Sequence, residues 1–108
     1  MGLESVAISV KVRLKLSHLI YILYEKEYFG FWKTAEIYVD SIYDTIFKIP
    51  QLKHSKTANP KLGHFFVRHK ANENTTYYII FDKKDNRYLV KDIISNHDKL
   101  YSKVILKP

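Results

Sequence analysis

The 108-residue sequence predicts an α+β fold with the element order β-α-α-β-β-β, in which an αα-hairpin covers one face of a small, mainly antiparallel sheet. Apolar residues between positions 10 and 49 recur every three or four residues, which is the period of an amphipathic helix. Beyond Gly63 the apolar period changes to two, which is typical of strands. Helices followed by consecutive strands favour separate layers around one core.

Composition and length limit the class of protein. The length fits one domain spanning residues 1–108, and nine tyrosines, six phenylalanines and one tryptophan provide apolar volume for its core. The chain has no cysteine, so it has neither a disulfide framework nor a thiolate metal site. No segment has the roughly 18 apolar residues of a transmembrane helix, and Glu4 lies where a secretory signal would be basic. We therefore expect a cytoplasmic protein that does not associate with membranes.

The first two elements are a short strand and a helix. Residues 6–9 (VAIS) are β-prone and should form a strand at or near one edge of the sheet. Ser9 is suited to cap the helix, because its hydroxyl can accept a hydrogen bond from one of the first free amides. We predict this helix over residues 10–26, with an end near Gly30, which can adopt the positive φ of a tight connection. Its apolar face consists of Val12, Leu16, Leu19, Ile20 and Leu23.

A second helix begins directly after this connection and ends before Pro50, which cannot continue a helix. Its apolar positions alternate in spacings of three and four and are Trp32, Ala35, Val39, Ile42, Ile46 and Ile49. Because the link is so short, the two helices must run antiparallel. The same spacing could also form a coiled-coil dimer, but a run of fewer than about three heptads favours packing within the chain.

Three strands follow a basic loop at residues 51–62, in which Asn59 and Pro60 indicate a turn. The strands are predicted at residues 64–70, 75–81 and 88–94. The middle strand, TTYYIIF, is apolar on both faces and should therefore lie centrally. The tail after His97 should either add an edge strand or lie against the sheet. We expect the sheet face opposite the helices to be partly open.

The chain resembles the RelE/ParE superfamily, the toxins of bacterial type II toxin–antitoxin modules. The resemblance covers residues 6–97 and is carried by AIS before the first helix, LIYILYEKEYFGFWKTAEIYVDSIYDTIFKIP, GHFFVRH and NTTYYIIFDKKDNRYLVKDIISNH. Within this superfamily, the chain is similar to the branch whose members have sequences of roughly the form keYF … A … Yv … I … IP, followed by TTWYi.F … yLi..I..NH. The resemblance implies two alternative activities: RelE-like members cut messenger RNA in the ribosomal A site without a metal, whereas ParE-like members poison DNA gyrase. It also implies a cognate antitoxin, encoded in an adjacent gene.

The resemblance assigns a site for RNA cleavage to the last strand and its neighbours. His97 takes the position of the general acid, and an imidazole can protonate a 5′-oxygen leaving group near neutral pH. Asn96 would orient it. Arg68 would grip a phosphate through two parallel hydrogen bonds, and Lys70 lies on the same strand face. Lys91 has the same parity as His97, so we expect the two to converge with Arg68.

Charge supports a polyanionic or acidic partner. The net charge is +7, and its cations are scattered along the chain. Further contacts to an RNA backbone are assigned to Lys53, Lys56 and Lys61.

A simpler interpretation is that His97 is a solvated strand end and that Arg68 and Lys70 only solubilise an exposed strand. We also expect an acidic antitoxin that adds a strand or a helix to the open sheet face.

One residue departs from the RNA-cleaving pattern. Thr75 lies where these relatives commonly have an arginine that stabilises the pentavalent phosphate. A hydroxyl cannot replace this charge, and the loss of one such contact commonly costs about 10²-fold in rate. The leading hypothesis is a ribosome-dependent endoribonuclease toxin without cofactors. The alternatives are a toxin that inhibits gyrase by binding and a degenerate member that only binds a partner.

No metal site is expected. His64 and His69 are an odd number of residues apart in a strand, so they should point to opposite faces. The other histidines do not form pairs with the spacing of metal ligands.

Overall fold

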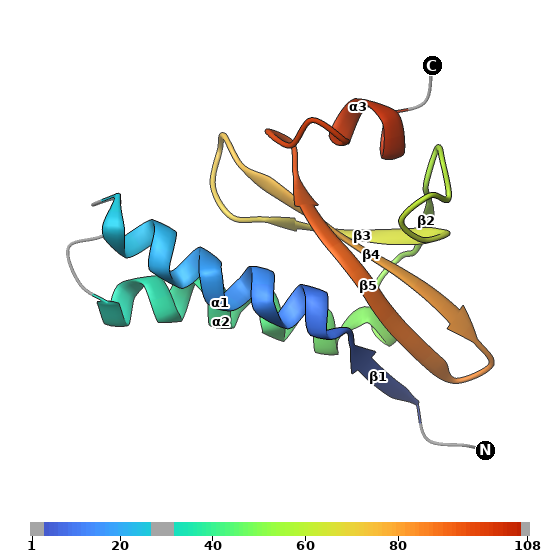
Figure 1. Ribbon diagram of the computed structural model, residues 1–108. Coiled ribbons are helices and arrows are strands. Elements are labelled where there is room, and N and C mark those ends of the chain that lie inside the picture. The colour runs from blue at the N-terminus through green and yellow to red at the C-terminus, as the bar shows by residue number, and fades with distance from the viewer. Residues whose placement is uncertain (1–3, 27–31, 107–108) are drawn as a thin grey trace.

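A mixed five-stranded sheet carries two long helices on one face and a short helix on the other, which makes this an α+β fold (Figure 1). The computed structural model describes residues 4–26 and 32–106. Its elements are β1 (Ser5–Ile8), α1 (Val10–Glu25), α2 (Trp32–Phe47), the 3₁₀ turn η1 (Ile49–Gln51), β2 (Ser55–Lys56), β3 (Phe65–Lys70), β4 (Thr76–Lys84), β5 (Arg87–Ser95) and α3 (Tyr101–Val104). The two long helices run antiparallel beneath the sheet, as predicted. Within the described ranges, no helix combines the length and apolar character required to cross a membrane.

The strand order across the sheet is β1-β5-β4-β3-β2. β1 pairs in parallel with β5, whereas the other neighbours are antiparallel. The predicted meander and the edge position of the first strand are therefore confirmed. One edge differs from the prediction, because Ser55 and Lys56, assigned to a loop, form a strand opposite Phe66 and Phe65. A strand of two residues is too short to show a period of two in the sequence.

Local signals in the sequence account for both long helices. The Ser9 hydroxyl accepts a hydrogen bond from the Val12 amide at 3.3 Å and caps α1 as predicted. α2 ends at Phe47, and Pro50 lies in the turn η1 that follows. The buried positions of this region fall on the predicted apolar faces and are Val12, Leu16, Leu23, Ala35, Val39, Ile42, Ile46 and Ile49. The predicted connection at Gly30 lies outside the described residues.

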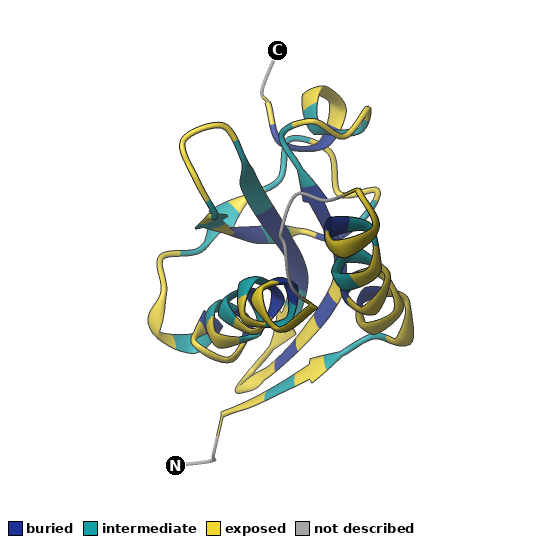
Figure 2. Ribbon diagram, turned by 90° about the vertical axis from the view of Figure 1, so that its left-hand side faces the viewer, coloured by how far each residue is buried: buried dark blue, intermediate teal, exposed yellow. Residues whose placement is uncertain are grey.

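Two hydrophobic clusters occupy the two sides of the sheet. The larger lies between the sheet and the helices α1 and α2, whose inward faces are buried in Figure 2. Its sheet residues are Val67, Ile79, Phe81, Tyr88, Val90 and Ile93. The smaller lies beneath α3 and contains Phe66, Tyr78, Ile80, Ile94, Val104 and Ile105. The tail therefore lies against the sheet, one of its two predicted positions, and covers part of the face that we expected to be open.

A β-bulge interrupts the alternation of β5. Two consecutive residues of β4 pair with Val90 and Asp92, so Lys91 between them is an extra residue. As a consequence, Val90 and Ile93 both belong to the helix-side cluster, although their spacing is odd. Residues beyond the bulge therefore point to the face opposite to the one that strict alternation along the strand predicts.

Candidate functional site

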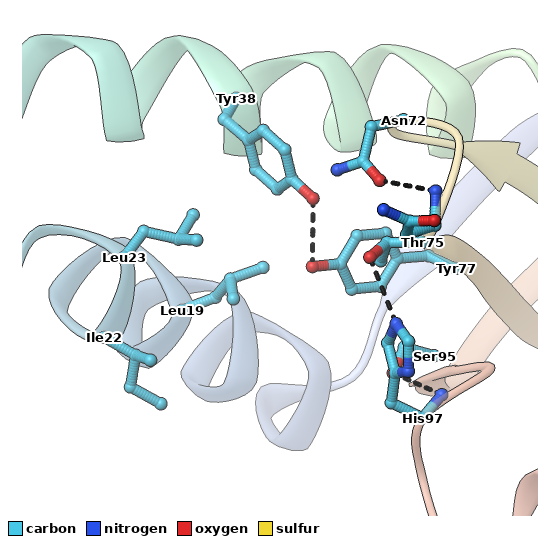
Figure 3. A pocket seen from close by; sticks show the side chains of 10 residues that line it. Leu19, Ile22, Leu23, Tyr38, Asn72, Thr75, Tyr77, Ser95 and His97 are labelled. Atoms are coloured by element: carbon cyan, nitrogen blue, oxygen red, sulfur yellow. Dashed lines mark hydrogen bonds between the residues drawn. The ribbon is translucent and has the colours of Figure 1, made fainter. Parts of the chain in front are cut away.

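A pocket opens between the helical hairpin and the ends of β4 and β5 (Figure 3). Its volume is about 480 Å³. Three aliphatic side chains of α1, namely Leu19, Ile22 and Leu23, form one wall. The rest of the lining is polar and consists of Tyr38, Asn72, Asn74, Thr75, Tyr77, Ser95 and His97. An apolar wall therefore faces hydroxyl, amide and imidazole groups.

His97, the predicted general acid, follows β5 and lines this pocket. Its Nε2 atom lies 3.2 Å from the hydroxyl oxygen of Thr75, and its backbone amide donates a hydrogen bond to the Ser95 hydroxyl at 3.1 Å. Thr75 is the residue at which the resemblance leads us to expect an arginine. The structure thus places a hydroxyl rather than a guanidinium beside the imidazole.

Asn96, the predicted orienting partner of His97, directs its side chain to the backbone of the β3–β4 turn. Its Oδ1 atom accepts a hydrogen bond from the Thr76 amide at 2.9 Å, and its Nδ2 atom donates to the Asn74 carbonyl at 3.1 Å. Asn96 therefore fixes the turn that presents Thr75 to His97. Its side-chain hydrogen bonds among the described residues thus go to this turn and not to the histidine.

Two tyrosines from α2 and β4 meet in the pocket. The Tyr38 hydroxyl donates a hydrogen bond to the Tyr77 hydroxyl at 3.3 Å (Figure 3). Burial, together with this hydrogen bond, raises the pKa of Tyr77, so its hydroxyl stays protonated at neutral pH. The pair was not predicted, because the two residues are 39 positions apart and no short-range pattern connects them.

Arg68, the predicted phosphate ligand, lies on the other side of the sheet. Its guanidinium carbon is 5.1 Å from the centre of the Phe66 ring and 6.0 Å from that of Tyr78. Both rings belong to the cluster beneath α3, whereas His97 lines the pocket on the side of α1 and α2. The structure therefore does not bring Arg68 and His97 together. Lys70 is exposed at the end of β3 and shares the face of Arg68 through the alternation of that strand.

Lys91 also lies on the side away from α1 and α2. Its ammonium nitrogen is 3.1 Å from one carboxylate oxygen of Asp82, and the other oxygen is 2.7 Å from Nδ1 of His64. Partial burial favours a higher pKa for Asp82, but hydrogen bonds from His64 and Lys91 outweigh it and lower the pKa. The prediction that Lys91 and His97 share a face is wrong, because the bulge at Lys91 reverses the alternation beyond it.

The three lysines expected to contact an RNA backbone lie at and beside the sheet edge opposite β1. Lys53 precedes β2, Lys56 belongs to it, and Lys61 follows it in the predicted turn. All three are exposed, and none forms an ion pair with another residue of the described chain. Their charges face solvent and do not contribute to the lining of the pocket.

His69 connects β3 to α2. Its Nδ1 atom is 2.7 Å from the Thr45 hydroxyl, and its Nε2 atom is 3.3 Å from the Ser41 hydroxyl. Burial lowers the pKa of His69, so the folded state favours the neutral imidazole. His64 and His69 lie on opposite sides of the sheet, as their odd spacing predicts.

We expect His69 to make the protein less stable in mild acid. Its contribution to the free energy of unfolding is fully present above the ordinary histidine pKa of about 6.5. As the pH falls through this value towards the lowered pKa of the folded state, the unfolded chain takes up the proton first and the contribution is lost. Urea unfolding at about pH 7.5 and about pH 5 should therefore show a smaller loss of stability in a His69→Gln variant than in the wild type.

The control for this experiment is a His18→Gln variant, because His18 is exposed on α1. This variant should lose as much stability in acid as the wild type. Equal acid-induced losses in the wild type and in His69→Gln would contradict the prediction.

No group of three or more His, Cys, Asp or Glu side chains among the described residues is arranged to hold a metal ion. Comparison with known proteins adds no assignment, since no family model, curated protein or solved structure matches the chain. The activity of the chain must therefore be inferred from its residues and their geometry.

Proposed function

We propose that the chain is the toxin of a type II toxin–antitoxin module of the RelE/ParE kind, and that it acts in the cytoplasm by binding its target, as ParE-like toxins act on DNA gyrase. The resemblance over residues 6–97 supports this proposal, and the order of the elements is compatible with it. One observation favours binding over cleavage of messenger RNA: Arg68 and His97 lie on opposite sides of the sheet.

Metal-independent cleavage of RNA requires a proton donor and a phosphate ligand at the same scissile phosphate. The general acid must come within about 3 Å of the oxygen that it protonates. Arg68 packs over Phe66 on one side and His97 lies in the pocket on the other, so one phosphate cannot contact both through the intervening sheet. Thr75 also lacks the charge that stabilises a pentavalent phosphate, which commonly costs about 10²-fold in rate. A binding mechanism does not need these groups to converge.

The charge of the chain favours macromolecular partners. A net charge of +7 accelerates association with acidic protein surfaces and with nucleic acid. The exposed cations that carry much of this field include Lys53, Lys56, Lys61 and Lys70. A mostly acidic antitoxin, encoded in an adjacent gene, would neutralise them by adding a strand or a helix to the toxin. Co-purification with the product of the neighbouring small reading frame tests this partner.

Alanine substitutions at the two predicted catalytic side chains should leave toxicity nearly unchanged. Arg68 and His97 are exposed, and substitutions of this type usually change free energies by about 0.5 kcal/mol, or roughly twofold in an equilibrium. If general acid catalysis caused the toxicity, His97→Ala would lose roughly 10²-fold or more. Growth after induction measures toxicity. The purified protein should inhibit supercoiling by gyrase, and primer extension should find intact messenger RNA.

Two outcomes would contradict this proposal. Codon-phased cuts in messenger RNA that disappear in His97→Ala would support ribosome-dependent cleavage instead. If the wild-type chain is not toxic when expressed without an antitoxin, the assignment as a toxin fails, and a degenerate member that only binds a partner is the better interpretation.

A further inference from the structure

The pocket beside His97 has no role in the proposed toxin activity, and its lining differs in charge from the rest of the chain. The sequence contains 18 lysine and arginine residues, yet among the residues that the structure describes no lysine, arginine, aspartate or glutamate lines this pocket. The titratable groups among the described lining side chains are Tyr38, Tyr77 and His97. The described lining is therefore polar but contains no lysine, arginine or carboxylate side chain.

The charge and polarity of this lining restrict the chemical class of ligand that can bind. A phosphate or carboxylate group placed inside would lose its hydration without gaining a lysine or arginine partner, and an ammonium group would gain no carboxylate, so both would bind at a net cost. A purely aliphatic ligand would leave the hydroxyl and amide groups of one wall without partners. The part of a ligand that enters must be neutral, with one apolar surface and one edge that forms hydrogen bonds.

The polar wall offers donors and acceptors close together. The Tyr77 hydroxyl accepts a hydrogen bond from Tyr38, so its own proton is directed elsewhere. Asn72 accepts the Asn74 amide with its Oδ1 atom at 2.9 Å, which leaves the Nδ2 hydrogens as donors. The Thr75 hydroxyl and the His97 ring, 3.2 Å apart, add a pair whose donor and acceptor roles can exchange.

We infer that this pocket binds a nucleobase in the form of a free nucleoside. A nucleobase is neutral and planar, and its edge alternates donors and acceptors in the way that the polar wall requires. Its face would pack against Leu19 and Leu23 of α1, while its edge would contact Tyr77 and Asn72 (Figure 3). The volume of about 480 Å³ lies within the usual range of small-molecule sites. The ribose would extend towards solvent.

Amide NMR spectra of the intact protein, recorded during titration with adenosine, guanosine, cytidine and uridine, test this inference. At least one nucleoside should shift the signals of Asn74, Thr75 and His97 in a saturable manner. Tyr77→Phe removes one hydroxyl and should weaken binding roughly fivefold. Thr75→Val is a second variant with the same expected direction. Because no charge is involved, the affinity should not depend on salt, unlike binding through phosphates.

The matched control is Tyr101→Phe. Its hydroxyl pairs with that of Tyr78 at 3.5 Å on the opposite side of the sheet, so its removal should not affect nucleoside binding. The inference is overturned if none of the four nucleosides shifts the pocket signals, or if Tyr101→Phe weakens binding as much as Tyr77→Phe. It is also overturned if indole, which has a ring of similar size but a single donor, binds as tightly as the best nucleoside.

Discussion

Replacing Phe81 by alanine is expected to lower the free energy of unfolding by about 4 kcal/mol. Phe81 is 0% exposed and lies in the centre of the larger cluster. Its ring centre is 5.0 Å from that of His54, 5.8 Å from that of Phe65 and 6.0 Å from that of Tyr88. The substitution removes the buried ring and leaves a cavity that paired strands on both sides cannot close. For a small domain this is a large part of the total stability.

The matched control is Phe47→Ala, because the same side chain on α2 is 55% exposed. It should lower the free energy of unfolding by less than about 1 kcal/mol. Urea unfolding followed by circular dichroism measures both variants. Similar losses at the two positions would show that Phe81 is not the centre of the core.

Asp92→Ala should be the most destabilising substitution of a charged residue, with a loss of about 2 kcal/mol. The Asp92 side chain is 2% exposed and accepts hydrogen bonds from the ammonium groups of Lys11 and Lys15, at 2.8 and 2.5 Å. It also accepts the Ile93 amide at 2.8 Å. The substitution leaves that amide without its partner and removes two of the side-chain hydrogen bonds that join α1 to β5. The lysines are partly exposed and return to water, which keeps the loss below that of a fully buried ion pair.

The contribution of Asp92 should also depend on pH. Burial favours a higher pKa, but the hydrogen bonds from Lys11 and Lys15 outweigh it and lower the pKa of the carboxyl group. The stabilisation is therefore present above the ordinary carboxyl pKa of about 4 and is lost as the pH falls through the lowered value. The difference between wild type and Asp92→Ala should shrink accordingly in acid unfolding experiments.

Asp82→Ala is the matched control for Asp92. Its carboxylate also has two side-chain partners, the His64 imidazole and the Lys91 ammonium group, but it is partly exposed and both partners are more exposed still. Its loss should be below about 1 kcal/mol at neutral pH. If Asp82→Ala destabilises the protein as much as Asp92→Ala, burial does not determine the strength of these interactions.

The helices and most of the sheet could be predicted because each depends on a local pattern. The apolar periods of α1 and α2, the cap at Ser9, the alternation in β3 and the run of β-branched and aromatic residues in β4 all lie within short windows of sequence. The edge position of β1 also followed, since its apolar residues need a neighbouring strand. Residues that are close together in the sequence determine each of these features.

The arrangement of the site could not be predicted in the same way. Alternation along β5 placed Lys91 and His97 on one face, but a single bulge at Lys91 reversed the sides beyond it. Nothing in the sequence around Lys91 marks the bulge, because its cause is the register with β4. The pocket has the same origin: Tyr38 and Tyr77 meet only because α2 lies against β4. Long-range packing decides both features.

The two-residue strand β2 has a consequence for behaviour at high protein concentration. It pairs only with Phe65 and Phe66, so in the described chain no strand pairs with the outer edge of β3 from Val67 to Lys70. An unpaired strand edge of this kind can pair with a strand of a second molecule and start fibril growth. Arg68 and Lys70 project from this stretch, and their like charges repel an identical stretch on another molecule. These two cations would thus act as gatekeepers against aggregation, whatever ligand they bind.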